Sequence, residues 1–393
     1  MIYRKLLLII AGILSLFFYS CKDNPTLVGA NLLKNDYINV KQLDSYTDSL
    51  QQTSSYYKKV IPLGGSNYLL VGNNANVQAS TLVKYAISLP DSMITDLNNN
   101  AASVVSSTIY FIPIYTFGDS NASFDFSVHK VSSVWTTIGF DADSLPGLIY
   151  DQTDISSNHQ LTDSLVSVDI SNSVTENWIK DVGDSTYSSD YGIYLTPVSA
   201  KKVVGFELIT SSATYALSLQ IVLQKSGVYT DTLTFYPLEA TSVVTGSMPT
   251  AAVQGDMFIQ SGLSVNSKLW FNISSIPKNA NINSATLTFT KDTISTITGS
   301  SYSNVLAVYM LKDSSTNLID STISANSLSS SGNTFTGSIS TFVQSWVDGS
   351  SNQGLLLKTA YPAEGLELFA VKNSSAADIS MRPRLQITYT TKK

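Results

Sequence analysis

The sequence predicts an all-β protein: two tandem antiparallel β-sandwich or jelly-roll domains after a lipoprotein signal peptide. Short apolar stretches recur between clusters of Gly, Asn, Ser and Pro, and long helical periodicity is almost absent. That pattern favours a sandwich or jelly roll. Apolar side chains at 217, 219, 221 and 223 alternate with polar ones at 218, 220 and 224, and residues 385–390 alternate likewise. A two-residue period fits a strand with one buried face.

Internal similarity indicates two copies of one unit. Val174 lies four residues before Trp178, and Phe342 lies four residues before Trp346. This spacing puts each pair on one face of a short helical turn, so we expect both tryptophans to be core residues. A loop and a Gly-led apolar strand follow each turn. Three more stretches align between the copies: 82–90 with 269–277, 104–111 with 282–289, and 218–221 with 384–387.

The N-terminus has the pattern of an export signal. A basic pair precedes the apolar run 6–19, which is short for a membrane span and suits a signal peptide. The run ends at Phe18-Tyr19-Ser20-Cys21, which contains the single cysteine of the chain. This segment resembles the bacterial lipoprotein cleavage box, which implies that Cys21 is lipidated. The alternative is an ordinary signal peptide followed by an incidental cysteine.

The resemblance also implies a location. One acyl chain holds a protein weakly and several hold it firmly, and bacterial lipoproteins carry several, so Cys21 should attach the protein lastingly to a membrane. Lys22-Asp23-Asn24 resembles the signal that sends some Gram-negative lipoproteins to the outer face of the outer membrane. A polar tether without that meaning is the alternative. We expect an outer-membrane, lipid-anchored protein displayed at the cell surface.

Composition excludes several classes. Charged residues make up 13% of the chain, against roughly 25% in an ordinary soluble domain. Ser, Thr, Asn and Tyr fill polar positions instead, as on the exposed strands of extracellular β-proteins. The net charge of −6 without a basic stripe argues against nucleic acid as a partner. A single cysteine allows no internal disulfide.

These observations give four expected segments. Residues 1–20 are the signal peptide, and residues 21–57 are the lipidated cysteine with a tether. Residues 58–228 form the first β-sandwich domain and residues 229–393 the second. Each domain is long enough to bury a two-sheet core.

The second unit resembles a known family. Residues 281–287, the Phe342/Trp346 turn, the strand after Gly354 and the closing segment 382–385 are similar to a DNRLRE-type domain. The resemblance covers most of residues 269–389. It implies a secreted, carbohydrate-binding-module-like β-sandwich, and some members of that family bind polysaccharide.

Signals for catalysis are weak. The two histidines, His129 and His159, have no zinc-site spacing, and no Gly-x-Ser-x-Gly motif occurs. A Ser-His-Asp triad stays open because triads assemble from distant positions. Acidic residues near 177–190 suit either calcium or, more often, a solvated turn. We expect no enzyme activity, no cofactor and no metal.

Two functions remain. The first is a non-catalytic surface lipoprotein that binds extracellular polysaccharide, with Tyr187, Tyr191 and Tyr194 as candidates for an exposed aromatic surface. The alternative is a structural or assembly lipoprotein that binds another cell-envelope protein. A glycan binder should expose aromatic side chains, whereas an assembly protein should expose a broad apolar patch.

Overall fold

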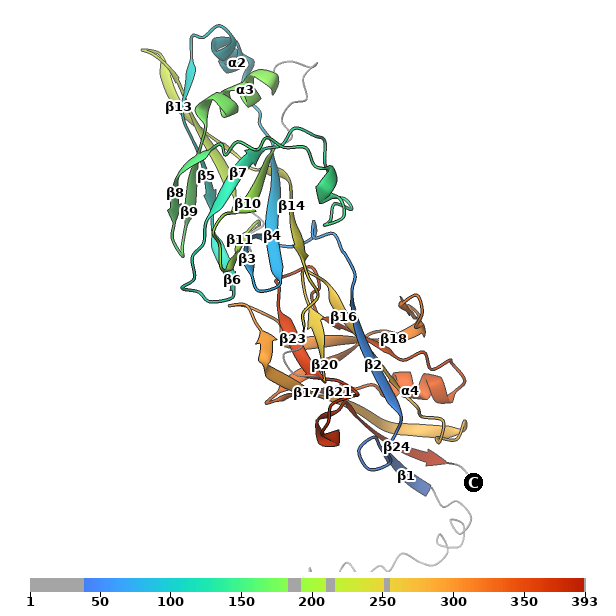
Figure 1. Cartoon of the computed structure of the whole chain (residues 1–393). Helices are drawn as coiled ribbons and strands as arrows, with labels where there is room; N and C mark the ends of the chain where they lie inside the picture. The colour runs from blue at the N-terminus through green and yellow to red at the C-terminus, as the bar shows by residue number, and fades with distance from the viewer. Residues whose placement is uncertain (1–38, 183–191, 210–215, 251–254, 392–393) are drawn as a thin grey trace, which may run out of the picture.

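The computed structural model describes residues 39–182, 192–209, 216–250 and 255–391. Strands make up 50% of the structure and helices 10%, and the strands pair antiparallel, so the all-β prediction is confirmed. Figure 1 shows two lobes stacked end to end. The first lobe contains β3 to β14, and the second contains β15 to β24 together with β1 and β2.

The first lobe has two sheets that face each other across one core. The larger sheet contains β3 (Tyr68–Asn74), β4 (Val77–Tyr85), β6 (Pro113–Phe117), β7 (Phe126–Lys130), β10 (Ile193–Pro197), β11 (Val203–Glu207) and β14 (Pro237–Gly246). The smaller sheet contains β5 (Ser103–Phe111), β8 (Ser156–Leu161), β9 (Val166–Ile170), β12 (Ser218–Lys225) and β13 (Tyr229–Phe235). Strands β9 and β12 of the smaller sheet alternate buried and less buried side chains, whereas β3, β4, β7 and β11 of the larger sheet are buried along most of their length. The facing sides of the two sheets meet in one apolar cluster.

Short helices complete the first lobe. Helix α2 (Asp91–Asn98) precedes β5, α3 (Asn172–Val182) follows β9, and the 3-10 turn η1 (Leu145–Gly147) lies in the β7–β8 connection. Helix α3 packs on β5 and buries Trp178 and Ile179 in the core. The helix face that contains Val174 and Trp178, which the spacing predicted to be apolar, is therefore the face that packs against the core.

The second lobe is built on one twelve-stranded sheet. Its strands are β1 (Asn39–Asp44), β2 (Gln52–Lys58), β15 (Asp256–Gln260), β16 (Val265–Phe271), β17 (Ala280–Ile297), β18 (Val305–Asp313), β19 (Leu318–Ile319), β20 (Asn326–Ser331), β21 (Thr334–Ser338), β22 (Leu355–Thr359), β23 (Leu368–Lys372) and β24 (Arg384–Thr391). Helix α4 (Ser340–Val347) packs on β17, and η2 (Ile379–Met381) precedes β24.

This sheet closes into a barrel. The ring runs β17–β21–β20–β18–β22–β16–β15–β23 and returns to β17. Strand β17 makes closure possible because it is 18 residues long. Its first part pairs with β24 and β21, and from Lys291 it pairs with β23, with a register shift between Asp292 and Ile297. Closure leaves the strands of the ring without free edges, unlike the sandwich that we expected for this domain, and β1, β2 and β24 pair outside the ring.

The strand pairings do not follow the boundaries that we expected at residues 57 and 228. Strand β1 pairs with β24 and β2 pairs with β16, so residues 39–58 are part of the second lobe and not only a tether. Strand β14 pairs with β4, so residues 237–246 belong to the first lobe. The first lobe is thus inserted between β2 and β15, and the two lobes are nested in the sequence.

The aligned stretches nevertheless take matching places in the two lobes. Strands β5 and β12 pair in the first lobe as β17 and β24 pair in the second. The loops after α3 and α4 reach Gly192 and Gly354, with φ of 84° and 90°. A Cβ atom at these glycines would lie 2.1 Å from Val83 O and 2.7 Å from Leu269 O, so both positions require glycine.

A buried contact joins the lobes. Phe117, at the end of β6, forms a β-bridge with Gly299 of the second lobe, and side chains of both lobes share an apolar cluster. Tyr115 Oη donates to Glu367 Oε1 at 2.9 Å and accepts from Leu366 N at 2.9 Å. Glu367 Oε2 accepts from Ser261 Oγ at 2.7 Å. These contacts fix the lobes against one another.

Candidate functional site

A groove lies where the two lobes meet, with a volume of about 230 Å³. We call it the tyrosine groove. It is lined by Tyr68, Ser301, Tyr302, Ser303, Thr359, Ala360, Tyr361, Glu364 and Glu367. Tyr68 comes from β3 of the first lobe, and the other residues come from the β17–β18 and β22–β23 connections and the end of β22. Both lobes therefore build one site.

Three aromatic rings line the tyrosine groove. Tyr302 is 44% exposed and Tyr361 is 59% exposed. Tyr68 is half-buried and stacks on Tyr115 with ring centroids 5.5 Å apart. Such amphipathic rings offer an electron-rich face to the C–H groups of a ligand and a hydroxyl to its polar groups.

The two glutamates of the groove have different roles. Glu367 is buried, and burial raises the pKa of its carboxyl, while the hydrogen bonds from Ser261 and Tyr115 oppose the rise. Both of its oxygens are occupied at the lobe contact. Within the described residues, no side chain donates a hydrogen bond to the carboxylate of Glu364, which is partly exposed. Burial raises the pKa of the Tyr68 hydroxyl, and the nearby charges of Glu364 and Glu367 raise it further.

Thr359 supplies a further polar group. It ends β22 and is only 6% exposed. Its hydroxyl oxygen has no hydrogen-bond partner among the residues that the structure describes. An unpaired buried hydroxyl costs free energy unless a ligand or water satisfies it. A residue that lines the tyrosine groove therefore has a buried hydroxyl without a partner among the described residues.

The tyrosines expected from the sequence lie elsewhere. Tyr187 and Tyr191 are outside the described residues, as is Cys21. Tyr194 is 5% exposed, so it is not part of an exposed aromatic surface. Its hydroxyl donates to Ser80 Oγ at 3.0 Å, and its ring lies 4.9 Å from that of Tyr150. Tyr194 is buried because β10 is an inner strand between β4 and β7.

Both tryptophan expectations are confirmed. Trp178 is 1% exposed in the core of the first lobe, and Trp346 is 8% exposed in the core of the second. Neither ring is available as a stacking platform. The groove tyrosines were missed because Tyr302 and Tyr361 lie in connections without periodicity, and only the fold brings Tyr68 to them.

A Ser-His-Asp arrangement is present in the first lobe. Ser156 Oγ lies 2.9 Å from His159 Nε2, and His159 Nδ1 lies 2.8 Å from Asp125 Oδ1. However, the Ser156 hydroxyl and backbone N–H both donate to Asp154 Oδ1, at 2.5 and 2.9 Å. With its proton committed to Asp154, Ser156 can only accept from His159, the reverse of the transfer that activates a nucleophile. The contacts fix the bulged strand β8.

His129 lies in β7 and is buried. Its Nε2 lies 2.8 Å from Ser127 Oγ, and its Nδ1 lies near the carbonyls of Asp151 and Thr153. In the part of the chain that the structure describes, no three His, Cys, Asp or Glu side chains group as metal ligands would. The expected acidic loop near 177–190 lies largely outside that part.

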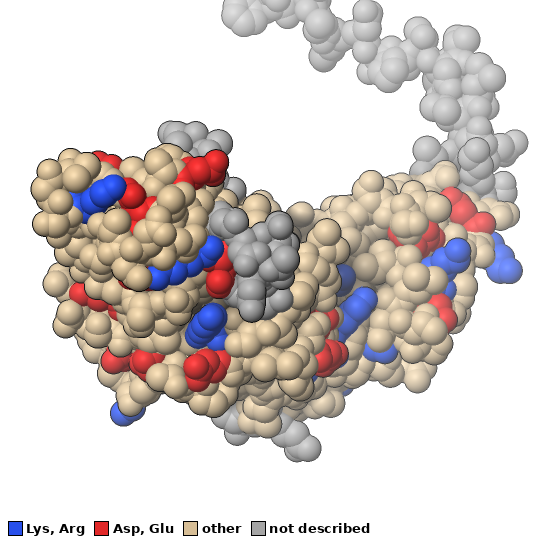
Figure 2. Space-filling model, turned by 90° about the horizontal axis from the view of Figure 1, so that it is seen from above, with Lys and Arg blue, Asp and Glu red and all other residues tan. Residues whose placement is uncertain are grey.

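Charges are sparse over the molecule. Figure 2 shows Lys, Arg, Asp and Glu scattered singly or in small groups on one face, as the composition predicts. Within the described ranges, no helix has the length and apolar character needed to cross a membrane.

No family model matches the chain, and it has no match among curated proteins. The DNRLRE resemblance therefore stays a prediction.

Proposed function

We propose that this protein is a non-catalytic outer-membrane lipoprotein that binds extracellular polysaccharide in the tyrosine groove. The combination of exposed aromatic rings with an unpaired carboxylate and an unpaired buried hydroxyl supports the proposal. A sugar ring has an apolar C–H face that packs on an aromatic ring and hydroxyl groups that donate to a carboxylate. Pockets of this kind hold a ligand by apolar contact and orient it with a few polar groups.

The proposal assigns roles to individual side chains. Tyr302 and Tyr361 stack on sugar rings, and Glu364 accepts hydrogen bonds from sugar hydroxyls. Because Tyr302 and Tyr361 are exposed to solvent, a polysaccharide chain can pass through the groove and extend beyond it. Lipidation of Cys21 holds the protein at the cell surface, where such polysaccharide lies.

A glycan-array screen followed by titration calorimetry tests the proposal. The chain from Pro25 is suitable because it contains every described residue. Tyr302→Ala and Glu364→Gln should each weaken binding of the selected glycan by about tenfold, or about 1.4 kcal/mol. Tyr236→Ala is a matched control, because Tyr236 is 45% exposed and Tyr302 is 44% exposed. Absence of any bound glycan, or equal losses for Tyr236→Ala and Tyr302→Ala, contradicts the proposal.

A second candidate is an assembly lipoprotein that binds another envelope protein. One observation favours it: Val134, Ile138 and Ile149 are 80%, 87% and 64% exposed in the β7–β8 connection. Ser133 Oγ accepts from Ile149 N at 3.0 Å, which joins the backbone segments that carry Val134 and Ile149. Exposed apolar groups of this kind mark protein contacts. Ile138→Asp should then release a co-purifying envelope protein without changing glycan binding.

A further inference from the structure

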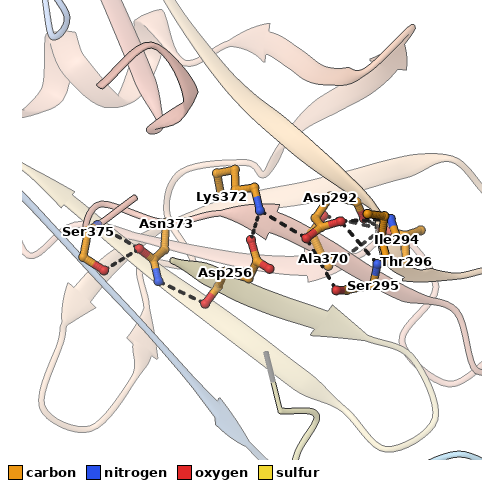
Figure 3. Close-up of polar contacts among 9 residues, drawn as sticks. All are labelled: Asp256, Asp292, Ile294, Ser295, Thr296, Ala370, Lys372, Asn373 and Ser375. Atoms are coloured by element: carbon orange, nitrogen blue, oxygen red, sulfur yellow. Dashed lines mark hydrogen bonds and ion pairs between the residues drawn. The ribbon is translucent and has the colours of Figure 1, made fainter. Parts of the chain in front are cut away.

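One lysine and two aspartates meet where the barrel of the second lobe closes (Figure 3). Lys372 ends β23, Asp256 begins β15 and Asp292 lies in β17. Asp256 and Lys372 are directly opposed in the β15–β23 ladder, and Asp292 is opposed to Ala370 on the other side of β23. Lys372 Nζ lies 2.7 Å from Asp256 Oδ1 and 3.1 Å from Asp292 Oδ2.

The two carboxyl groups have unequal surroundings. The Asp256 side chain has no exposed surface, and its Oδ2 has no hydrogen-bond partner among the described residues. Asp292 Oδ1 accepts from Ile294 N at 2.9 Å and from Ser295 N at 3.3 Å. Backbone donors thus stabilise a charge on Asp292, whereas a charge on Asp256 has only Lys372. A buried ion pair with an unsatisfied oxygen is costly to maintain.

The different surroundings of Asp256 and Asp292 shift their pKa values in opposite directions. Burial raises the pKa of Asp256, and the Asp292 charge raises it further, against the opposing effect of Lys372. Burial also disfavours ionisation of Asp292, but its neighbours Asp256 and Lys372 and the N–H groups of Ile294 and Ser295 outweigh burial and lower its pKa to about 2. The site therefore places an amine beside one carboxyl group whose ionisation burial opposes and a second carboxylate that backbone donors keep ionised.

We propose that Lys372 and Asp256 condense to an intramolecular amide in the folded protein, with Asp292 carrying the proton. The neutral Lys372 amine attacks Asp256 Cγ, forming the N–C bond. Asp292 takes a proton from the attacking nitrogen and passes it to the departing oxygen, and the C–O bond breaks. One amide and one water result, so no oxidant, reductant or co-reactant is needed.

The required protonation state is accessible within the cluster. Proton transfer from the Lys372 ammonium to Asp256 gives a neutral amine and a neutral acid, a state that low polarity favours over two charges. Burial lowers the pKa of Lys372, but the two aspartates raise it overall. The neutral amine is therefore a minor species, and the bond forms slowly after folding. Because the groups are already in contact, the reaction needs no further encounter.

The product fits the site better than the ion pair does. The amide N–H replaces the ammonium as donor to Asp292 Oδ2, and Asp256 no longer bears a charge that lacks partners. The bond joins β15 to β23, across residues 116 positions apart in the sequence. A covalent link at the seam would hold the barrel closed in a protein exposed at the cell surface, where proteases act on transiently opened strands.

Peptide mass spectrometry of the full chain tests the proposal. After tryptic digestion, the peptide containing Asp256 should appear joined to the peptide containing Lys372, with a mass one water below the sum of the two. Tandem spectra locate the bond, and cleavage after Lys372 should be lost. Detection of both peptides only in linear form overturns the proposal.

Variants test the role of each group. Asp292→Asn keeps the side-chain shape and removes the proton carrier, so the linked peptide should fall about tenfold or more. Lys372→Arg keeps the positive charge and should give no linked peptide. Lys291→Arg is the matched control beside Asp292 on β17 and should link as the wild type does. A wild-type yield from Asp292→Asn would overturn its role as proton carrier.

Discussion

Replacement of Tyr115 by Phe tests how the lobes are held together. Tyr115 is 1% exposed, and its hydroxyl bonds to both Leu366 N and Glu367 Oε1. The Phe ring keeps the stacking on Tyr68 and the apolar packing. The variant therefore removes two buried hydrogen bonds and little else.

The expected loss follows from the groups left behind. Leu366 N–H and Glu367 Oε1 would each lack a partner inside the contact. An unsatisfied buried group costs about 1–3 kcal/mol, and more when it is charged. We expect Tyr115→Phe to lower the free energy of unfolding by about 2–5 kcal/mol, reduced if water enters the contact.

Urea unfolding and hydrogen exchange measure this effect. The first unfolding transition is the relevant one, because two lobes need not unfold together. The Leu366 amide should exchange faster in the variant. Tyr309→Phe is the control, since among the described residues the Tyr309 hydroxyl has no hydrogen bond, and its effect should stay within about 0.5 kcal/mol. A loss for Tyr115→Phe as small as that of the control would refute the reasoning.

Four further predictions concern the core, the lobes, pH and the anchor. Trp346→Ala should cost about 3–5 kcal/mol by urea unfolding, and an unshifted transition would contradict the core assignment. Residues 229–393 lack β1 and β2, so this fragment should melt cooperatively only when a peptide of residues 39–58 is added; cooperative melting alone would show that β2 is dispensable. Burial raises the pKa of Glu367 above its ordinary 4.5, so its contribution to stability is present below pH 4.5 and is lost as pH rises through the folded-state pKa. Glu367→Gln should flatten that part of the stability–pH curve, and an unchanged curve would exclude Glu367 as its source. Cys21→Ser should move the protein out of the membrane fraction or leave it unprocessed, and cleavage with continued membrane attachment would argue against lipidation.

Local features of the second lobe could be predicted from sequence. The Phe342/Trp346 spacing predicts one buried helix face, and the structure buries both side chains in α4. Alternation over residues 385–390 predicts a half-buried strand, and β24 is that strand. The aligned stretches occupy matching strands in the two lobes. Each of these predictions depends on residues that are close in the sequence. At that range the spacing of apolar residues indicates which face of a helix or strand is buried.

The candidate site could not be predicted in the same way. Tyr68 is separated from Tyr302 and Tyr361 by more than half of the chain. Each of these tyrosines alone resembles any other exposed or half-exposed aromatic residue of a β-protein. Tyr194 is an example. An apolar strand that contains a tyrosine has the same sequence pattern at the edge and at the centre of a sheet, and β10 is a central strand.

The sequence by itself determined the all-β class, the internal repeat and the core positions of Trp178 and Trp346. Only the tertiary structure decided that β1 and β2 belong to the second lobe, that β17 closes a barrel, and that the lobes form a groove at their junction. The physical reason is that a two-residue period specifies the buried face of a strand but not its partner. Partner choice depends on backbone hydrogen bonds, which every residue except proline offers, and on packing between residues far apart in the chain.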